Sequence, residues 1–368
     1  MKILLAPDKF KGSLSSMEVC QAIGRGLQKR YPQLALQYHP MADGGDGSLE
    51  VLKGHLDLGE QKVQTIDPLG RPLQASYFAS TDTAFIELAS ASGLVLLDPT
   101  ECNPLLTSTQ GSGQMIAHAL DRGCQQVYLF LGGSATNDAG MGISAALGCQ
   151  FRDAANQLLP PNGQSLTRIQ QIECQARFDF SKLRLRLLCD VNNPLHGPNG
   201  AAYVYAKQKG ATLKQIRELD RGLAHYGKVL LEHSGVAVSQ LPGSGAAGGI
   251  GASLVALFGA KLQKGFESLA ELTGLEEAIQ ASDCVISGEG KLDMQTLQGK
   301  VIAGIAMLCR KHRKPLVLFV GKNELNTMAI QALGARGVFA VANRAQNLQD
   351  AMFNGATYLE QLAIELSL

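Results

Sequence analysis

The chain has 368 residues, of which 45 % are hydrophobic and 18 % charged, and its formal net charge of +1 gives no reason to expect binding to nucleic acid or to a membrane surface. Aromatic residues make up 5 % and tryptophan is absent, so the stacking platform used by single-strand binders is missing. Because the length exceeds that of one ordinary core, we expect two domains in a globular, soluble protein.

Strands and helices alternate at the start of the chain. Residues 2–6 are short and apolar and predict a buried strand, and a capping box of Ser15 and Glu18 then predicts the start of a helix. A second strand ends at Pro40 and a helix follows near residues 48–56. This order predicts a parallel sheet with crossover helices.

The pattern changes after about residue 60. Short alternating runs separated by turn residues predict a mixed sheet, at Gln61–Ile66, Leu73–Phe78 and Ala84–Leu88. Strand and helix alternate again near the C-terminus. The simplest α/β architecture is therefore a discontinuous domain, residues 1–70 plus 280–368, with a second domain inserted at 71–279. A ligand is expected in a cleft between the two domains.

The first strand ends in a polar loop. In an open parallel sheet, ligands bind at the carboxyl ends of the strands. The loop residues that lie there are Asp8, Lys9, Lys11 and Ser13. The lysines suit an anionic substrate or a transferring phosphoryl group, and the alternative is a solvated basic turn.

Two glycine-rich turns carry the most information. The first, Met41–Gly47, holds Asp43 and Asp46, and the second, Gly132–Gly140, follows another apolar run. Glycine lets the backbone approach a ligand, and a helix start then offers N–H groups to an anion. Carboxylates beside a phosphate site indicate a bridging divalent cation, although aspartate is also common in turns and caps for purely local reasons.

The second turn also contains hydroxyl and amide groups that suit a phosphate or a hydroxy-acid. These are Ser134, Thr136, Asn137 and Asp138, for which an elaborate helix cap is the alternative. Further on, Asp190 and Asn192 follow an apolar strand, where a carboxylate fits a general base or a metal ligand, and an Asx turn is the structural alternative.

Two later segments complete the candidates. Gly243, Ser244 and Gly245 open a G-x-G-x-x-G match that does not follow a clear strand, so the dinucleotide interpretation is weak and a phosphate-cradling loop or a helix-packing site stays open. A further apolar strand leads into a loop before a helix, with Glu289, Lys291 and Asp293, which is either part of a site or a solvated turn.

Other features of the sequence mainly exclude classes of protein. The sequence lacks the motifs of P-loop enzymes, protein kinases, zincins and α/β-hydrolases. The 8 cysteines form no Cys-x-x-Cys pair and several lie in apolar stretches, so we expect buried free thiols in a reducing cytoplasm. There is no apolar run of the roughly 20 residues that a membrane span needs, and the apolar run after Lys2 is too short for us to expect a signal peptide.

Taken in order, these motifs resemble those of bacterial glycerate kinases of the type I family. The residues that carry the resemblance are Ala6–Ser13, Met41–Gly47, Gly132–Gly140, Asp190–Pro194, Pro242–Gly251 and Ser287–Asp293. The resemblance covers the whole chain. It implies two dissimilar α/β domains, one flavodoxin-like and discontinuous, the other inserted and mixed, and phosphorylation of D-glycerate by ATP with Mg²⁺.

The resemblance assigns no catalytic residue, so the roles are our own interpretation. We assign Lys9, Lys11 and Lys291 to charge stabilisation, Asp190 to the base, and Asp43, Asp46 and Glu289 to Mg²⁺. The remaining candidates, Asp8, Ser13, Ser134–Asp138, Asn192, Gly243–Gly245 and Asp293, are expected to hold substrate and phosphates. A nicotinamide-dependent hydroxy-acid dehydrogenase and a non-catalytic sugar-acid-binding protein are the alternatives, and a homo-oligomer stays open.

Overall fold

We describe a computed structural model of the chain, which covers all residues except Asp46, Ala176, Gly299 and Leu368 and omits the side chain of Gln298. Its contacts divide the chain into two compact units. Unit 1 comprises Met1–Leu56 and Lys264–Leu368, and unit 2 comprises Asp57–Gln263. The expected α/β fold, with one parallel and one mixed sheet, is confirmed.

The limits of these units differ from the boundaries at 70/71 and 279/280 that the sequence suggested. Strand β3 (Gly59–Ile66) pairs along its whole length with β4 (Pro72–Ala79), so both belong to unit 2. Helix α9 (Gly265–Thr273) packs with α2 (Ser48–His55) and therefore joins unit 1.

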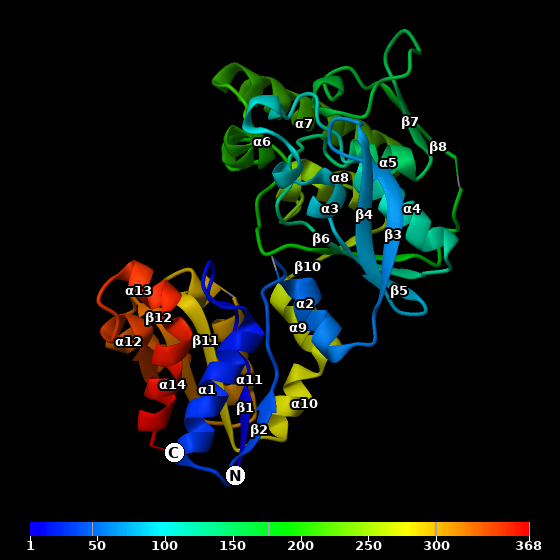
Figure 1. Cartoon of the computed structure of the whole chain (residues 1–368). Coiled ribbons are helices and arrows are strands. Elements are labelled where there is room, and N and C mark those ends of the chain that lie inside the picture. Colours follow the sequence, from blue (N-terminus) through cyan, green and yellow to red (C-terminus); the bar gives the residue numbers. More distant parts are fainter. Residues whose placement is uncertain (46, 176, 299, 368) are drawn as a thin grey trace. The chain divides into compact units, whose positions relative to one another are not determined.

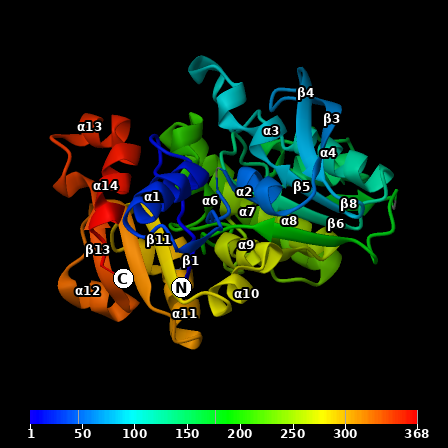
Figure 2. The same cartoon turned by 60° about the horizontal axis from the view of Figure 1, so that its bottom comes forward.

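Unit 1 is built on a five-stranded parallel sheet of order β13-β12-β11-β1-β2. Its strands are β1 (Lys2–Leu5), β2 (Ala35–Tyr38), β11 (Cys284–Leu292), β12 (Leu316–Asn323) and β13 (Ala335–Ala340). The helices not yet named are α1 (Ser16–Arg30), α10 (Leu275–Gln280), α11 (Val301–Lys311), α12 (Thr327–Leu333), α13 (Leu348–Phe353) and α14 (Gly355–Glu365). Helices α1 and α14, from opposite ends of the sequence, lie side by side in both views (Figures 1 and 2).

Alternation along the strands explains this packing. Ile3 and Leu5 of β1 contribute to one apolar cluster with Val19 and Ile23 of α1 and Leu359 of α14. The intervening residues of the strands are also buried, so the sheet is covered on both faces, as a parallel sheet requires. The capping box expected at the start of α1 is confirmed, because the Ser15 hydroxyl accepts from the backbone N–H of Glu18 and the Glu18 carboxylate accepts from that of Ser15.

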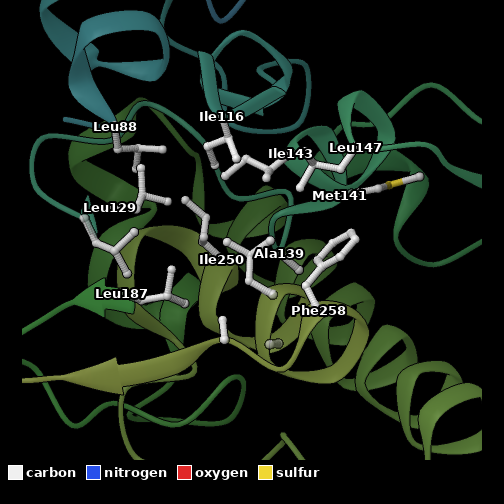
Figure 3. Close-up of a cluster of buried hydrophobic side chains, with 14 of the residues drawn as sticks. Leu88, Ile116, Leu129, Ala139, Met141, Ile143, Leu147, Leu187, Ile250 and Phe258 are labelled. Atoms are coloured by element: carbon white, nitrogen blue, oxygen red, sulfur yellow. The ribbon is translucent and has the colours of Figure 1, made fainter. Parts of the chain in front are cut away.

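Unit 2 has a six-stranded mixed sheet of order β10-β9-β6-β5-β4-β3. Strands β5 (Thr83–Glu87), β6 (Gln126–Phe130), β9 (Arg184–Leu188) and β10 (Lys261–Gln263) run parallel, and β3, β4 and β5 are joined antiparallel. Its helices are α3 (Ala89–Ser92), α4 (Gln110–Asp121), α5 (Met141–Ala146), α6 (Ala201–Tyr205), α7 (Leu213–Ser234) and α8 (Ala246–Phe258). The core brings Leu129 and Leu187 of the sheet together with Ile143 of α5 and Ile250 of α8 (Figure 3).

A small separate hairpin corrects our expectation that all cysteines are free. Strands β7 (Cys149–Arg152) and β8 (Gln171–Cys174) pair antiparallel with the two cysteines opposite one another, and these form a disulfide. Their 25-residue separation in sequence carries no signal of this pairing, which arises only when the two strands meet. The other cysteines are free: Cys20, Cys102, Cys124, Cys189, Cys284 and Cys309.

One further expectation about local structure was wrong. Strand β11 continues through Leu292, so Glu289 and Lys291 lie in a strand and not in a loop, because β11 stays paired with β12 as far as Asn323. The C-terminal segment forms two helices, because α13 ends at Asn354 and α14 begins at Gly355. Within the described residues, no helix is long and apolar enough to cross a membrane.

Candidate functional site

In unit 1, acidic side chains gather where β11 extends beyond the carboxyl ends of β1 and β2. Asp8 follows β1, and its backbone N–H donates to the Gly288 carbonyl of β11 at 2.8 Å. Glu289 is the next residue of β11, and Asp43 follows β2. The negative charges of Asp43 and Glu289 both act on Asp8, so the three carboxyl groups are electrostatically coupled. This is the edge of the sheet at which the sequence predicted ligand binding.

These acids are held in an unfavourable environment. Burial, followed by the charge of Asp43, raises the pKa of Asp8 to about 7. Burial likewise raises the pKa of Glu289 to about 7, although the Thr296 hydroxyl donates to its carboxylate and opposes the shift. Carboxyl groups whose pKa lies near neutrality are characteristic of functional sites, because folding alone gains nothing from them.

The turn that carries Asp43 is built by a close backbone approach. Gly265, the first residue of α9, leaves no room for a side chain, since a Cβ there would lie 2.0 Å from the Asp43 carbonyl oxygen. The Asp43 carboxylate accepts from the backbone N–H of Gly45 at 3.1 Å, which is an Asx turn. Asp46, the second aspartate predicted to bind metal, lies outside the described residues.

The acids of unit 1 are the kind of ligand that Mg²⁺ takes in proteins. Among the residues that the structure describes, no group of three His, Cys, Asp or Glu side chains is arranged as a complete metal cage. Mg²⁺ does not need one, because it is usually bound by one or two carboxylates together with water and substrate phosphates. Burial is the main cause of the raised pKa values of Asp8 and Glu289, and the negative charge of Asp43 adds to it at both groups. Carboxylates so placed are of the kind that a hydrated Mg²⁺ takes, and Asp43 and Glu289 would suit it.

The basic residues expected in this region have different surroundings. Lys9 is half-buried beside Gly47, where a Cβ would lie 3.9 Å from its Nζ, while Lys11 is exposed. The ammonium of Lys291 forms ion pairs with Asp293 at 3.3 Å and with Glu324 at 2.9 Å. Lys9 therefore lies next to the acidic turn, and Lys291 belongs to a surface ion-pair network.

Ser13 and Asp293 also have structural contacts. The Ser13 hydroxyl donates to the Met352 carbonyl at 2.6 Å and so ties the loop after β1 to α13. The backbone N–H of Asp293 donates to the Thr296 hydroxyl at 3.1 Å. Thr296, which the sequence did not single out, thus connects Asp293 to Glu289, and nothing in its sequence context marks it.

The acidic cluster predicts an unusual dependence of stability on pH. In the unfolded chain Asp8 titrates near 3.8, whereas in the fold it holds its proton up to about pH 7. The folded state therefore binds more protons between these values, and the free energy of unfolding falls as the pH rises from about 4 to 7. We expect Asp8→Asn, measured without divalent cations, to raise the melting temperature at pH 8 and to flatten this fall.

The matched control for that experiment is Asp153→Asn in unit 2. Hydrogen bonds from the Gln157 backbone and from Arg168 lower the pKa of Asp153, so its stabilising contribution is present at pH 8 and lost in acid. This control should lower the melting temperature at pH 8. A decrease for Asp8→Asn as well would contradict the proposed environment of Asp8.

In unit 2 the glycine-rich loop after β6 is organised around a buried carboxylate. The Asp138 side chain is 0 % exposed and accepts from the Thr109 backbone and hydroxyl, at 2.8 and 2.7 Å, and from the N–H groups of Gly140 and Gly142, both at 3.1 Å. Both carboxylate oxygens are thus occupied by the protein itself. The Asp138 carboxylate therefore shapes the loop, and its predicted contact with substrate stays a prediction.

A buried lysine, absent from our sequence candidates, supports the same loop. Lys209 is 2 % exposed, and its ammonium donates to the Ser134 hydroxyl at 2.7 Å and to the Thr136 carbonyl at 2.6 Å. Burial lowers the pKa of Lys209 to about 7, opposed by the charge of Asp138. Lys209 lies 73 residues from Thr136 in the sequence, and its own segment has the pattern of a surface turn. The neighbouring residues therefore do not predict that Lys209 is buried.

The loops after β6 and β9 and the loop before α8 meet at the carboxyl end of the parallel strands of unit 2. The backbone N–H of Ala139 donates to the Gly248 carbonyl at 3.0 Å, and that of Gly245 donates to the Asn193 carbonyl at 3.0 Å. A Cβ at Gly248 would lie 2.1 Å from the Thr136 carbonyl oxygen, so only glycine permits this approach. The structure thus brings Ser134–Asp138 and Gly243–Gly245 together within this unit.

The end of β9 supplies the remaining candidates. Asp190 and Asn192 are both exposed, so the Asp190 carboxylate is accessible to a ligand. Their neighbour Asn193 holds the loop, because its amide donates to the Asn199 carbonyl at 2.8 Å and accepts from the Tyr205 hydroxyl at 2.7 Å. The Val191 carbonyl lies 3.2 Å from where a Cβ on Gly243 would be, which places this loop next to the one before α8.

Comparison with known proteins assigns the family. The model of the glycerate kinase family matches residues 3–367. A glycerate kinase of Halalkalibacterium halodurans is 39 % identical over 98 % of this chain and 96 % of its own length, and a glycerate 2-kinase of Escherichia coli is 39 % identical over 97 % and 94 %. A solved structure assigned to glycerate kinase 2 of Salmonella typhimurium LT2 superposes with a TM-score of 0.87 at 36 % identity, covering 99 % of this chain and 96 % of that one. The chain is therefore an enzyme of the glycerate kinase family.

Proposed function

We propose that the protein transfers a phosphoryl group from ATP to D-glycerate with Mg²⁺ and forms 2-phosphoglycerate in preference to 3-phosphoglycerate. The observation that carries this proposal is the coupled group of Asp8, Asp43 and Glu289 in unit 1, just beyond the carboxyl ends of β1 and β2. Phosphoryl transfer relies on positioning and charge neutralisation, for which such acids, a cation and lysines are the usual means. The Escherichia coli relative, described as a glycerate 2-kinase, supports the choice of the 2-hydroxyl.

In this mechanism unit 1 supplies the carboxylates that would bind the metal ion and the lysines that stabilise negative charge. Asp43 and Glu289 would hold Mg²⁺ directly or through water, and the ion when bound would neutralise charge on the nucleotide phosphates. Asp8 lies near these two acids, because its backbone N–H donates to the Gly288 carbonyl next to Glu289 and its carboxyl group is electrostatically coupled to Asp43 and Glu289. Lys9, half-buried beside the acidic turn, stabilises negative charge on the transferring group, and the exposed Lys11 assists from the same loop.

Unit 2 supplies the residues that act on D-glycerate, the acceptor of the phosphoryl group. We propose Asp190 as the base that accepts the proton of the attacked hydroxyl, since its carboxylate is exposed at the end of a parallel strand. Asn192 is exposed two residues further on and is suited to contact the substrate. The loops that carry Ser134 and Gly243 to Gly245 supply hydroxyl and backbone groups for positioning, which is a major source of rate enhancement.

The direct test is release of ADP from Mg-ATP with D-glycerate, compared with L-glycerate and with no acceptor. We expect turnover that requires D-glycerate and is abolished by chelating the divalent cation. No ADP release with D-glycerate or related hydroxy-acids, together with reduction of a nicotinamide cofactor, would replace the kinase by the dehydrogenase alternative.

A further inference from the structure

Three neighbouring residues in unit 2 have buried polar atoms without partners. Across the described residues, the buried side-chain oxygen and nitrogen atoms that lack a hydrogen bond are Thr136 Oγ1, Asn137 Nδ2 and Oδ1, and Ser244 Oγ. All three side chains are 0 % exposed. A buried polar group without a partner is costly and is rarely kept in a fold unless something else satisfies it. Their concentration in two touching loops indicates one site.

The same two loops contain strained backbone. Ala139 and Ala247 adopt positive φ angles of 53° and 50°, which are uncommon for residues with a side chain. Gly248 and Gly249 continue this left-handed stretch, so the first turn of α8 is not helical. Strain of this kind is found mainly where a site requires a particular loop shape. It is thus a second observation, independent of the unpartnered atoms.

The chemistry of these atoms restricts the ligand. Asn137 provides donors and an acceptor, and exchanging its amide nitrogen and oxygen changes nothing because both lack partners. The hydroxyls of Thr136 and Ser244 each donate and accept. A phosphate chain only accepts and would leave the asparagine acceptor unsatisfied. A hydroxy-carboxylate fits all of them, because its carboxylate accepts and its hydroxyl donates.

Charged groups lie next to this cluster. The buried ammonium of Lys209 donates to the carbonyl of Thr136, and the buried carboxylate of Asp138, which follows Asn137, acts on Lys209 with the opposite charge. The two loops are in contact, since a Cβ on Gly248 would lie 2.7 Å from the Asn137 Cα. One small ligand can therefore contact groups from both loops.

We propose that Thr136, Asn137 and Ser244 form the subsite that recognises the carboxylate and the adjacent hydroxyl of the acceptor substrate. This inference rests on the proposed function for the identity of the acid. It assigns binding of the acceptor to the two loops of unit 2 and binding of the nucleotide to other residues. The sequence did not resolve which loops bind which of the two substrates. Lys209 is a positioning residue, because it acts through Ser134 and Thr136.

The test combines stability with kinetics. Thr136→Val and Ser244→Ala each remove an unpartnered buried hydroxyl, so both variants should melt at a higher temperature than the wild type in the absence of substrate. The same variants should raise KM for D-glycerate by about 10-fold or more, a usual effect of losing one hydrogen bond that only the substrate makes, and leave KM for ATP unchanged.

Thr65→Val is the matched control. The Thr65 hydroxyl is also buried in unit 2, but it donates to the Gly111 carbonyl at 2.9 Å and is bonded to Gln114 at 2.8 Å. Its removal should lower the melting temperature and leave both KM values unchanged. Asn137→Asp adds a charge that repels a carboxylate and should weaken D-glycerate binding in a calorimetric titration of the protein without nucleotide.

The outcomes separate the inference from the proposed function. If the wild type turns over D-glycerate and KM for this acid is unchanged in Thr136→Val and Ser244→Ala, the subsite is disproved while the kinase stands. A lower melting temperature for both variants would also overturn it, because their hydroxyls would then have partners. If the wild type shows no turnover, the proposed function fails, and calorimetry of D-glycerate with wild type and Asn137→Asp decides the subsite.

Discussion

Replacing Asp190 by asparagine should lower kcat for D-glycerate by about 10²–10⁴-fold, the usual contribution of a general base. Asparagine has nearly the same shape but does not accept the proton of the attacked hydroxyl. Asp190 is exposed at the end of β9, so the substitution should not disturb the fold. Steady-state kinetics and a thermal melt of the same sample check both expectations.

The control for Asp190→Asn is Asp179→Asn, an exposed aspartate of the same unit that pairs with Lys182 on the surface. This variant should keep the kcat of the wild type. The pH profile provides a second test, because loss of the base should remove the acidic limb from the dependence of kcat on pH. Near-normal turnover of Asp190→Asn would exclude Asp190 as the base.

Replacing Asp138 by alanine should reduce the free energy of unfolding by about 3–5 kcal/mol, a loss typical of breaking a buried, fully bonded group. The change leaves the buried N–H groups of Thr109, Gly140 and Gly142 without their acceptor. We expect this loss in urea unfolding monitored on unit 2. It should appear whether or not substrate is present.

Asp153→Ala is a suitable comparison for Asp138→Ala. Its carboxylate also accepts from backbone N–H groups, those of Ala155 and Gln157, but at an exposed turn where water replaces the lost acceptor. The loss of stability should therefore be much smaller. If Asp138→Ala were as stable as Asp153→Ala and instead had lost only affinity for substrate, Asp138 would be a ligand contact after all.

Local patterns predicted the order of strands and helices well. The apolar run before Pro7 and the capping box at Ser15 depend on neighbouring residues only, and both form as expected. The change to a mixed sheet after residue 60 could also be predicted, because the alternation of apolar and polar residues along a strand is a local property of the sequence. The glycine-rich turns lie at strand ends as predicted, since parallel topology follows from the order of the elements.

What could not be predicted depends on contacts between distant segments. Lys209 meets Ser134 only because the chain folds back, and in the sequence it is one of many lysines. Asp138 shares its loop with Asn137, yet one is fully bonded and the other has no partner, a difference set by Thr109 from another segment. The partner of Cys149 was likewise decided by the pairing of β7 with β8.

The central claim is that this chain phosphorylates D-glycerate, and the most direct measurement is NMR of a reaction containing ¹³C-labelled D-glycerate, Mg²⁺ and ATP. We expect ADP and a single new species whose C2 carbon is coupled to phosphorus, as in 2-phosphoglycerate. Coupling at C3 instead would retain the kinase but contradict the position. Unchanged D-glycerate with intact ATP, using protein that melts cooperatively, would contradict the claim itself.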